Sequence, residues 1–211
     1  MSRANIILTG FSGTGKSLLA KEIAKRSGWK SIDTDEEIIK LVGKPIAEIF
    51  QQNGEGKFRR LERQMLEEAC QQEHSVIAIG GGAIVDPDNY ELLAQSGLII
   101  CLEARAETIY QRLSQNAEPE LRPLLADDNP LERIRQLKAS RQPYYARADW
   151  TVHTDDLTIA EVAEEVIRGW RLLRFARNDK ERAHNDIDKD IACWVETATQ
   201  SYPIFVGWGL L

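Results

Sequence analysis

The chain has 211 residues, and its 33 acidic residues outnumber 27 lysines and arginines to give a formal net charge of −6. This length accommodates one domain with a complete core and a modest appendage, and the acidic charge disfavours a nucleic-acid partner. Because no apolar run approaches the roughly 18 residues of a membrane span, and because the first predicted strand begins at residue 5, we expect neither a membrane segment nor a signal peptide.

Short apolar runs alternate with segments of helical periodicity through the first 173 residues. The predicted strands cover residues 5–9, 29–32, 75–79, 98–102 and 150–152. The predicted helices cover 17–26, 35–41, 45–53, 58–72, 88–96, 106–113, a segment that begins at 130, and 158–173. Such alternation is typical of an α/β protein with a parallel sheet covered by helices on both faces.

Residues at the expected helix ends support these bounds. Gly28 is a typical C-terminal stop for the first helix. Asn129 followed by Pro130 predicts an N-cap and a first helical residue. Thr158 and Glu161 form a capping box for the helix that follows the last predicted strand of the sheet.

Residues 10–17 read GFSGTGKS, which matches the phosphate-binding P-loop pattern G-x-x-x-x-G-K-[ST]. The motif joins a predicted strand to a predicted helix, where glycines let backbone N–H groups surround an anion. We expect Lys16 to bridge the β- and γ-phosphates and the Ser17 hydroxyl to ligate Mg²⁺. The alternative is a glycine-rich turn that binds nothing, but the full pattern rarely arises by chance in this context.

Two further features lie at the carboxyl edge of the predicted sheet, where ligands bind in doubly wound folds. Asp33 and Asp35 follow the second strand. One carboxylate can hold Mg²⁺ through water, and the other can orient an acceptor hydroxyl and take its proton. Three glycines, 80–82, follow the third strand and permit close approach of a ligand to the backbone. The alternatives are acids that only cap a helix and glycines that form a mobile turn.

Four arginines complete the candidate site: Arg59, Arg60, Arg122 and Arg141. The planar guanidinium suits carboxylates and phosphates, although most arginines are solvated surface groups. Arg122 differs because it lies in the polar, proline-marked segment 117–129, which has the character of a lid. A lid that brings an arginine to the γ-phosphate also excludes water.

Together these residues resemble the shikimate kinase family. The matching stretches are GFSGTGKS (10–17), the run DTDEEIIKLVGKPIAEIFQQNGEGKFRRLE (33–62), AIGGGAI (78–84), LRPLL (121–125) and SRQPYYARAD (140–149). They occur in the family's order and spacing and cover about residues 3–173. The second stretch discriminates most, because gluconate kinases and adenylate kinases share the P-loop and a related fold but lack it.

The resemblance implies a P-loop NTPase-type fold, similar to nucleoside monophosphate kinases, with a mobile lid. It implies transfer of the ATP γ-phosphate to the 3-hydroxyl of shikimate. Asp35 would be the base, with Lys16 and Arg122 as the other catalytic residues. Ser17 and Asp33 would bind Mg²⁺, with Ser17 as the direct ligand.

The same resemblance implies two sets of binding residues. ATP would contact Gly13, Thr14, Gly15, Lys16, Ser17, Leu18, Arg112 and Arg122, with Thr154 to Leu157 near the adenine. Shikimate would contact Asp35, Arg59, Gly80, Gly81, Gly82 and Arg141, with the two arginines on its carboxylate.

The sequence changes character after Arg174. Residues 1–174 form the expected kinase domain, 175–193 a charged linker or solvated helix, and 194–211 a short strand pair with strands at 194–198 and 202–206. The stretch VETATQSYPIFVGWGLL (195–211) resembles the opening strands of 3-dehydroquinate synthase, which implies a kinase–synthase fusion cut inside the second enzyme, or a relic of one. The alternative is an idiosyncratic C-terminal hairpin.

Two other functions compete with the resemblance. The first is a P-loop kinase for another small polyol acid, such as gluconate. The second is a nucleotide-binding regulatory module without catalysis, which predicts loss of a key residue, yet all of them are present. The three scattered cysteines, Cys70, Cys101 and Cys193, predict reduced thiols in a cytoplasmic protein, and we expect the kinase domain to be a monomer.

Overall fold

The computed structural model describes residues 4–115, 129–183, 191–196 and 201–205, with side chains up to residue 173. It contains two compact units, Met1–Ile167 and Arg168–Leu211, each described here by itself. The expected lid with Arg122 lies outside the described residues.

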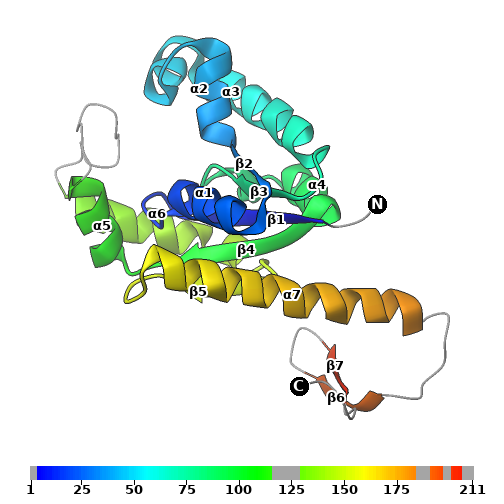
Figure 1. The fold of residues 1–211 in the computed structure, drawn as a ribbon. Coiled ribbons are helices and arrows are strands. Elements are labelled where there is room, and N and C mark those ends of the chain that lie inside the picture. Colours follow the sequence, from blue (N-terminus) through cyan, green and yellow to red (C-terminus); the bar gives the residue numbers. More distant parts are fainter. Residues whose placement is uncertain (1–3, 116–128, 184–190, 197–200, 206–211) are drawn as a thin grey trace. The chain divides into compact units, whose positions relative to one another are not determined.

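The first unit is built on a five-stranded parallel sheet in the order β2-β3-β1-β4-β5 (Figure 1). Its strands are β1 (Asn5–Gly10), β2 (Lys30–Asp33), β3 (Ser75–Ala78), β4 (Gly97–Glu103) and β5 (Trp150–His153). All four neighbouring pairs are parallel. Strands β1 and β3 are buried throughout, so they read as continuous apolar runs rather than alternating ones. The α/β fold class is therefore confirmed.

The helices of the described chain follow the expected order. They are α1 (Lys16–Ser27), α2 (Thr34–Val42), α3 (Ile46–Cys70), α4 (Pro87–Ser96), α5 (Ala106–Gln115), α6 (Pro130–Tyr145) and α7 (Ile159–Ala183), with a 3₁₀ turn η1 (Ala83–Val85). Figure 1 shows α2 and the first part of α3 projecting away from the sheet.

Two helices differ from the expected bounds. The segments expected at 45–53 and 58–72 form α3 together, interrupted only at Gly54, where φ is 73° and ψ is 170°. Helix α7 continues to Ala183 instead of ending near residue 173, so the first part of the charged segment is helical.

Caps fix several helix ends as expected. Gly28 closes α1 in the left-handed conformation with φ of 73°. The side chain of Asn129 accepts a hydrogen bond from the Glu132 amide at the start of α6. The Thr158 amide donates to Glu161, and the Glu161 amide donates back to the Thr158 hydroxyl, which completes the capping box.

The main core lies on one face of the sheet. Side chains of β1, β3 and β4, including Ile7, Ile77 and Ile99, pack there against Leu66 of α3 and Leu93 of α4. Helix α1 contacts β1, β2 and β3. A smaller cluster joins α2 and α3 through Ile38, Ile49, Phe58, Leu61 and Met65.

The second unit contains a hairpin in which β6 (Ile191–Glu196) pairs antiparallel with β7 (Ser201–Phe205). Two strands were expected there, and β6 begins three residues before the expected start at 194. None of the helices in the described ranges combines the length and the apolar character that crossing a bilayer requires.

Close contact between β1 and β4 yields a stability prediction. A Cβ added to Gly97 would collide with the Asn5 carbonyl of the neighbouring strand. We expect Gly97→Ala to lower the free energy of unfolding by about 1–3 kcal/mol, the usual cost of overpacking. Chemical denaturation of the purified protein measures this change.

Gly56→Ala is the matched control. Gly56 lies within α3 and a Cβ there meets nothing within 4 Å. Because alanine favours helix over glycine by about 0.5–1 kcal/mol, this variant should be slightly more stable. Equal effects of the two substitutions would contradict the steric account of Gly97.

Candidate active site

The P-loop has the geometry of an anion site at a helix N-terminus. Gly13 and Gly15 adopt φ of 84° and 96°, conformations that glycine reaches without strain. The buried Thr14 hydroxyl donates a 2.8 Å hydrogen bond to the Phe11 carbonyl and so pins the loop. The first turn of α1 holds no acidic residue, which leaves the positive end of the helix dipole to attract an anion.

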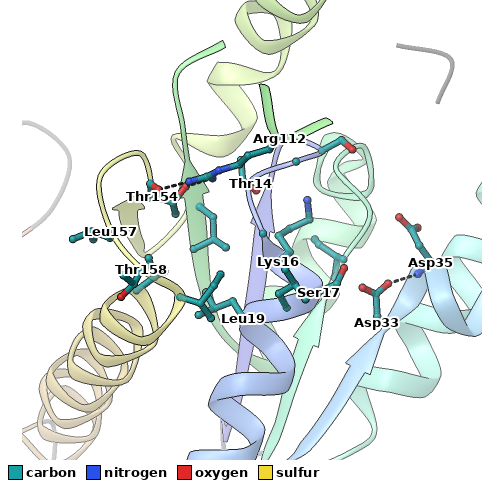
Figure 2. A pocket seen from close by; sticks show the side chains of 18 residues that line it. Thr14, Lys16, Ser17, Leu19, Asp33, Asp35, Arg112, Thr154, Leu157 and Thr158 are labelled. Carbon is teal, nitrogen blue, oxygen red and sulfur yellow. Dashed lines mark hydrogen bonds between the residues drawn. The ribbon is translucent and has the colours of Figure 1, made fainter. Parts of the chain in front are cut away.

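This loop lines a cavity of about 560 Å³ (Figure 2). In Figure 2 the cavity extends from Asp33 and Asp35 on one side, past Lys16 and Ser17, to Thr154 and Leu157 on the other. The cavity therefore connects the acids after β2 with the segment after β5. The expected ATP-binding residues among the described ones all line it: Gly13, Thr14, Gly15, Lys16, Ser17, Leu18 and Arg112.

Lys16 is bonded to its own loop. Its Nζ donates to the carbonyl oxygens of Gly10 and Phe11 at 2.9 and 3.0 Å. Burial lowers the pKa of Lys16 below its ordinary value, while the charges of Asp35 and Asp33 oppose that shift. The half-buried ammonium is thus held by neutral carbonyls and faces nearby carboxylates, and it is placed to meet phosphate oxygens.

Asp33 caps α2 and also lines the cavity. Its Oδ1 accepts hydrogen bonds from the amides of Asp35 and Glu36 at 3.0 and 3.2 Å. The capping interpretation of Asp33 is therefore correct, but it does not exclude a second role, because the same residue borders the cavity beside Ser17.

Asp35 does not cap a helix. Its Oδ1 is buried, and it has no hydrogen-bond partner within the described residues. Burial and then the negative charge of Asp33 raise the pKa of Asp35, while Lys16 and Arg59 oppose the rise. A buried carboxylate oxygen with a raised pKa and no donor is suited to accept a proton from a bound hydroxyl.

Glycines 80–82 lie at the centre of a second group of side chains. A Cβ built on Gly80 would lie 3.0 Å from Asp35 Oδ1, and one built on Gly82 would lie 3.1 Å from Arg59 Nη1. A Cβ on Gly81 would lie 3.4 Å from Arg141 Nη1. The structure therefore brings together the residues that were expected to bind the acceptor, and the glycines provide the room between them.

Glu62 belongs to this group, although the sequence analysis did not select it. Its side chain is 1% exposed and bonds Arg59 Nη1 at 2.7 Å, and its Oε1 lies 3.0 Å from the Cβ position of Gly80. Burial raises the pKa of Glu62, against the hydrogen bond and charge of Arg59. A signal existed, because Glu62 is one turn before Leu66 on the apolar face of its helix.

Arg59 is also held from the solvent side, where Glu55 accepts from its Nη2 at 3.0 Å. The two glutamates fix the guanidinium on both sides. Arg60, the neighbouring candidate, is exposed and does not line the cavity.

The far end of the cavity is closed by Arg112 and the segment after β5. Arg112 Nη1 donates to the Thr154 hydroxyl at 2.9 Å, and Nη2 donates to the Thr154 carbonyl. Asp155 anchors the same segment by accepting from the Thr108 hydroxyl at 2.6 Å. Thr154 and Leu157 both line the cavity (Figure 2), so this end offers a planar guanidinium and an apolar side chain to a ligand.

The oxygen atoms near the P-loop fit Mg²⁺. This ion binds one or two protein oxygens, keeps several waters and takes the rest of its ligands from phosphates. The Ser17 hydroxyl and the Asp33 carboxylate border the same cavity, and Oδ1 alone of Asp33 is engaged in capping. Within the described ranges no three His, Cys, Asp or Glu residues cluster as metal ligands.

Comparisons with known sequences point to one protein family. The family model described as shikimate kinase matches residues 12–170. A shikimate kinase from Caldanaerobacter subterraneus subsp. tengcongensis is 44% identical over 170 residues, which cover 81% of this chain and 98% of the relative. The shikimate kinase of Thermus thermophilus is 39% identical over 167 residues, which cover 79% and 90%.

Solved structures agree. The shikimate kinase of Acinetobacter baumannii, solved in complex with shikimate, is 33% identical with a TM-score of 0.73, over 78% of this chain and 91% of that one. A gluconokinase from Sinorhizobium meliloti is 19% identical with a TM-score of 0.54, over 87% and 99%, and shares the fold alone. The chain therefore belongs to the shikimate kinase family.

Proposed function

We propose that this chain transfers the γ-phosphate of ATP to the 3-hydroxyl of shikimate and releases ADP and shikimate 3-phosphate. The observation that carries the proposal is the meeting of Asp35, Arg59 and Arg141 at glycines 80–82, next to the cavity that Lys16 lines. The 44% identity to a shikimate kinase and the solved complex of a relative with shikimate support the choice of acceptor.

ATP is the phosphoryl donor in this proposal. Its phosphates would bind the P-loop amides and Lys16, and its adenine would lie by Arg112, Thr154 and Leu157. Mg²⁺ would be held by Ser17 and Asp33, and when bound it neutralises charge on the phosphates. Arg122, from outside the described residues, would be the lid arginine.

Shikimate is a small carboxylate with three hydroxyls. The side chains around glycines 80–82 have the complementary chemistry. The guanidinium groups of Arg59 and Arg141 can bind the carboxylate through charge-assisted hydrogen bonds. Asp35 can bind a hydroxyl and take its proton as the oxygen attacks phosphorus. Lys16 then stabilises the charge on the transferring phosphoryl group.

The proposal extends to the organisation of the chain. It comprises a monomeric, cytoplasmic kinase domain at 1–174, a charged segment at 175–193 and a strand pair at 194–211. The free cysteines Cys70 and Cys101 support a reducing compartment.

The tail is proposed to derive from 3-dehydroquinate synthase as part of a kinase–synthase fusion. Pairing of Val195 with Tyr202 supports the expected strand pair within the resembling stretch. Sequence downstream of residue 211 decides this origin, because a stop codon without synthase-like sequence would argue against it.

The direct test of the function is an ADP-release assay with ATP, Mg²⁺ and either shikimate or gluconate. We expect turnover with shikimate and background rates with gluconate. The residues around glycines 80–82 suit a rigid cyclic carboxylate, and the chain belongs to the shikimate kinase family. Faster turnover with gluconate would refute the proposal, and nucleotide binding without turnover of either acceptor would favour the regulatory module.

Substitution of Arg141 should change KM for shikimate and leave KM for ATP nearly unchanged. We expect Arg141→Ala to raise KM for shikimate about tenfold or more, since a hydrogen bond to a charged group contributes roughly 1.5–3 kcal/mol. KM for ATP should change little. Arg60→Ala, at an exposed arginine, serves as the control with both constants unchanged; equal increases in both KM values for Arg141→Ala would contradict its role.

The raised pKa of Asp35 predicts the pH dependence of the reaction. Only the ionised carboxylate accepts a proton, and burial raises its pKa above the ordinary value of 3.8. As pH falls, kcat/KM for shikimate should therefore decline at a higher pH than an ordinary aspartate would give. Asp35→Asn should lower kcat by about 10²-fold or more.

Glu62→Gln identifies the titrating group, because the pKa of Glu62 is raised as well. If Asp35 is the base, the acidic decline persists in this variant. A profile that becomes flat in Glu62→Gln would assign the decline to Glu62 instead.

A further inference from the structure

Tyr145 is a buried polar residue that the proposed function does not use. It is the last residue of α6, is 1% exposed and packs in the main core. Its hydroxyl reaches the glycine turn, where it donates a 2.7 Å hydrogen bond to the Gly81 carbonyl. The ring of Tyr145 lies in the core and its hydroxyl lies at glycines 80–82, where the acceptor is proposed to bind. This residue can therefore influence acceptor binding.

Arg141 lies beside this hydroxyl. Arg141 and Tyr145 are four residues apart on α6, so they share one face of the helix. The positive charge of Arg141 lies close enough to the phenol to oppose the rise of its pKa. Arg141 Nη1 and Tyr145 Oη lie 3.4 and 3.5 Å from the same point, the Cβ position of Gly81.

The chemistry of the three groups sets the direction that each hydrogen bond can take. A guanidinium only donates and a carbonyl only accepts, whereas a phenol does both. Because the phenol proton points to the Gly81 carbonyl, the phenol oxygen can accept from a guanidinium N–H. Burial raises the pKa of Tyr145 to about 12, so the phenol keeps this proton at neutral pH.

Arg141 also contacts the Phe11 ring, but this contact does not fix the rotation of the guanidinium within its own plane. Its guanidinium carbon lies 5.5 Å from the centre of the Phe11 ring, in the P-loop. A cation–π contact holds the guanidinium against the ring but specifies poorly how the group is turned within its plane. A hydrogen bond from one guanidinium nitrogen to the phenol oxygen would specify that rotation, because a hydrogen bond is directional.

We infer that Tyr145 is a positioning residue that holds the Arg141 guanidinium in the orientation that the acceptor's carboxylate requires, with the Gly81 carbonyl as its anchor. The inference rests on the proposed function, in which Arg141 binds that carboxylate. Tyr145 acts through Arg141 and does not itself contact the acceptor.

Tyr145→Phe tests the inference, because it removes the hydroxyl and keeps the ring in the core. We expect KM for shikimate to rise about three- to tenfold, the factor that a typical net hydrogen-bond contribution gives. KM for ATP and kcat should stay within about twofold, since neither Lys16 nor Asp35 bonds the phenol. A KM for shikimate equal to that of the wild type overturns the inference, and so does an equal rise in KM for ATP.

Tyr90→Phe is the matched control. The Tyr90 hydroxyl also donates to a carbonyl, that of Arg147 at 3.2 Å, on the exposed surface. Loss of that bond should leave both KM values unchanged. A comparable rise in KM for shikimate would show that any lost tyrosine hydroxyl has this effect, which contradicts a specific role for Tyr145.

The double variant Arg141→Ala/Tyr145→Phe separates positioning from a purely structural role. If Tyr145 acts through Arg141, its substitution should change KM for shikimate less than twofold once Arg141 is absent. Full additivity of the two effects overturns the inference.

The same series distinguishes failure of this inference from failure of the proposed function. A large effect of Arg141→Ala without any effect of Tyr145→Phe refutes the positioning role alone. No effect of Arg141→Ala on KM for shikimate refutes the roles of both residues, whereas a lack of turnover with shikimate in the wild-type protein refutes the proposed function.

Discussion

Opposite charges that share one buried edge of the sheet are the constraint on which the acceptor pocket depends. A charged side chain removed from water costs several kcal/mol unless partners compensate it, and this applies most to Glu62, whose side chain is 1% exposed. Three cations and three anions meet there: Lys16, Arg59 and Arg141 with Asp33, Asp35 and Glu62. They come from α1, β2 with α2, α3 and α6, so the pocket exists only when these elements have assembled.

The order of the strands makes this assembly possible. β1 lies between β3 and β4, and β2 lies beside β3, so the carboxyl ends of β1, β2 and β3 meet at one edge. The P-loop, the acids after β2 and glycines 80–82 each follow one of these ends. A donor site and an acceptor site thus become neighbours, although Lys16 and Arg141 are 125 positions apart in the sequence.

Much of this arrangement could be predicted from the sequence, because local patterns carry it. The apolar strands, the P-loop and the caps at Gly28 and Thr158 depend on near neighbours in the chain, and the structure confirms them. Tyr145 could not be assigned in the same way. Its role arises from Gly81, more than 60 residues away in the sequence, and such a contact leaves no local pattern.

The bonds of Lys16 to its own loop have a consequence for ligand discrimination. Its ammonium already has two carbonyl partners, so a ligand gains only the difference between its own attraction and theirs. A neutral oxygen offers little more than a carbonyl does, whereas a polyphosphate offers full negative charge in a site of low dielectric. Lys16 therefore gains little from a neutral molecule and exchanges its two carbonyl partners only for a strong anion.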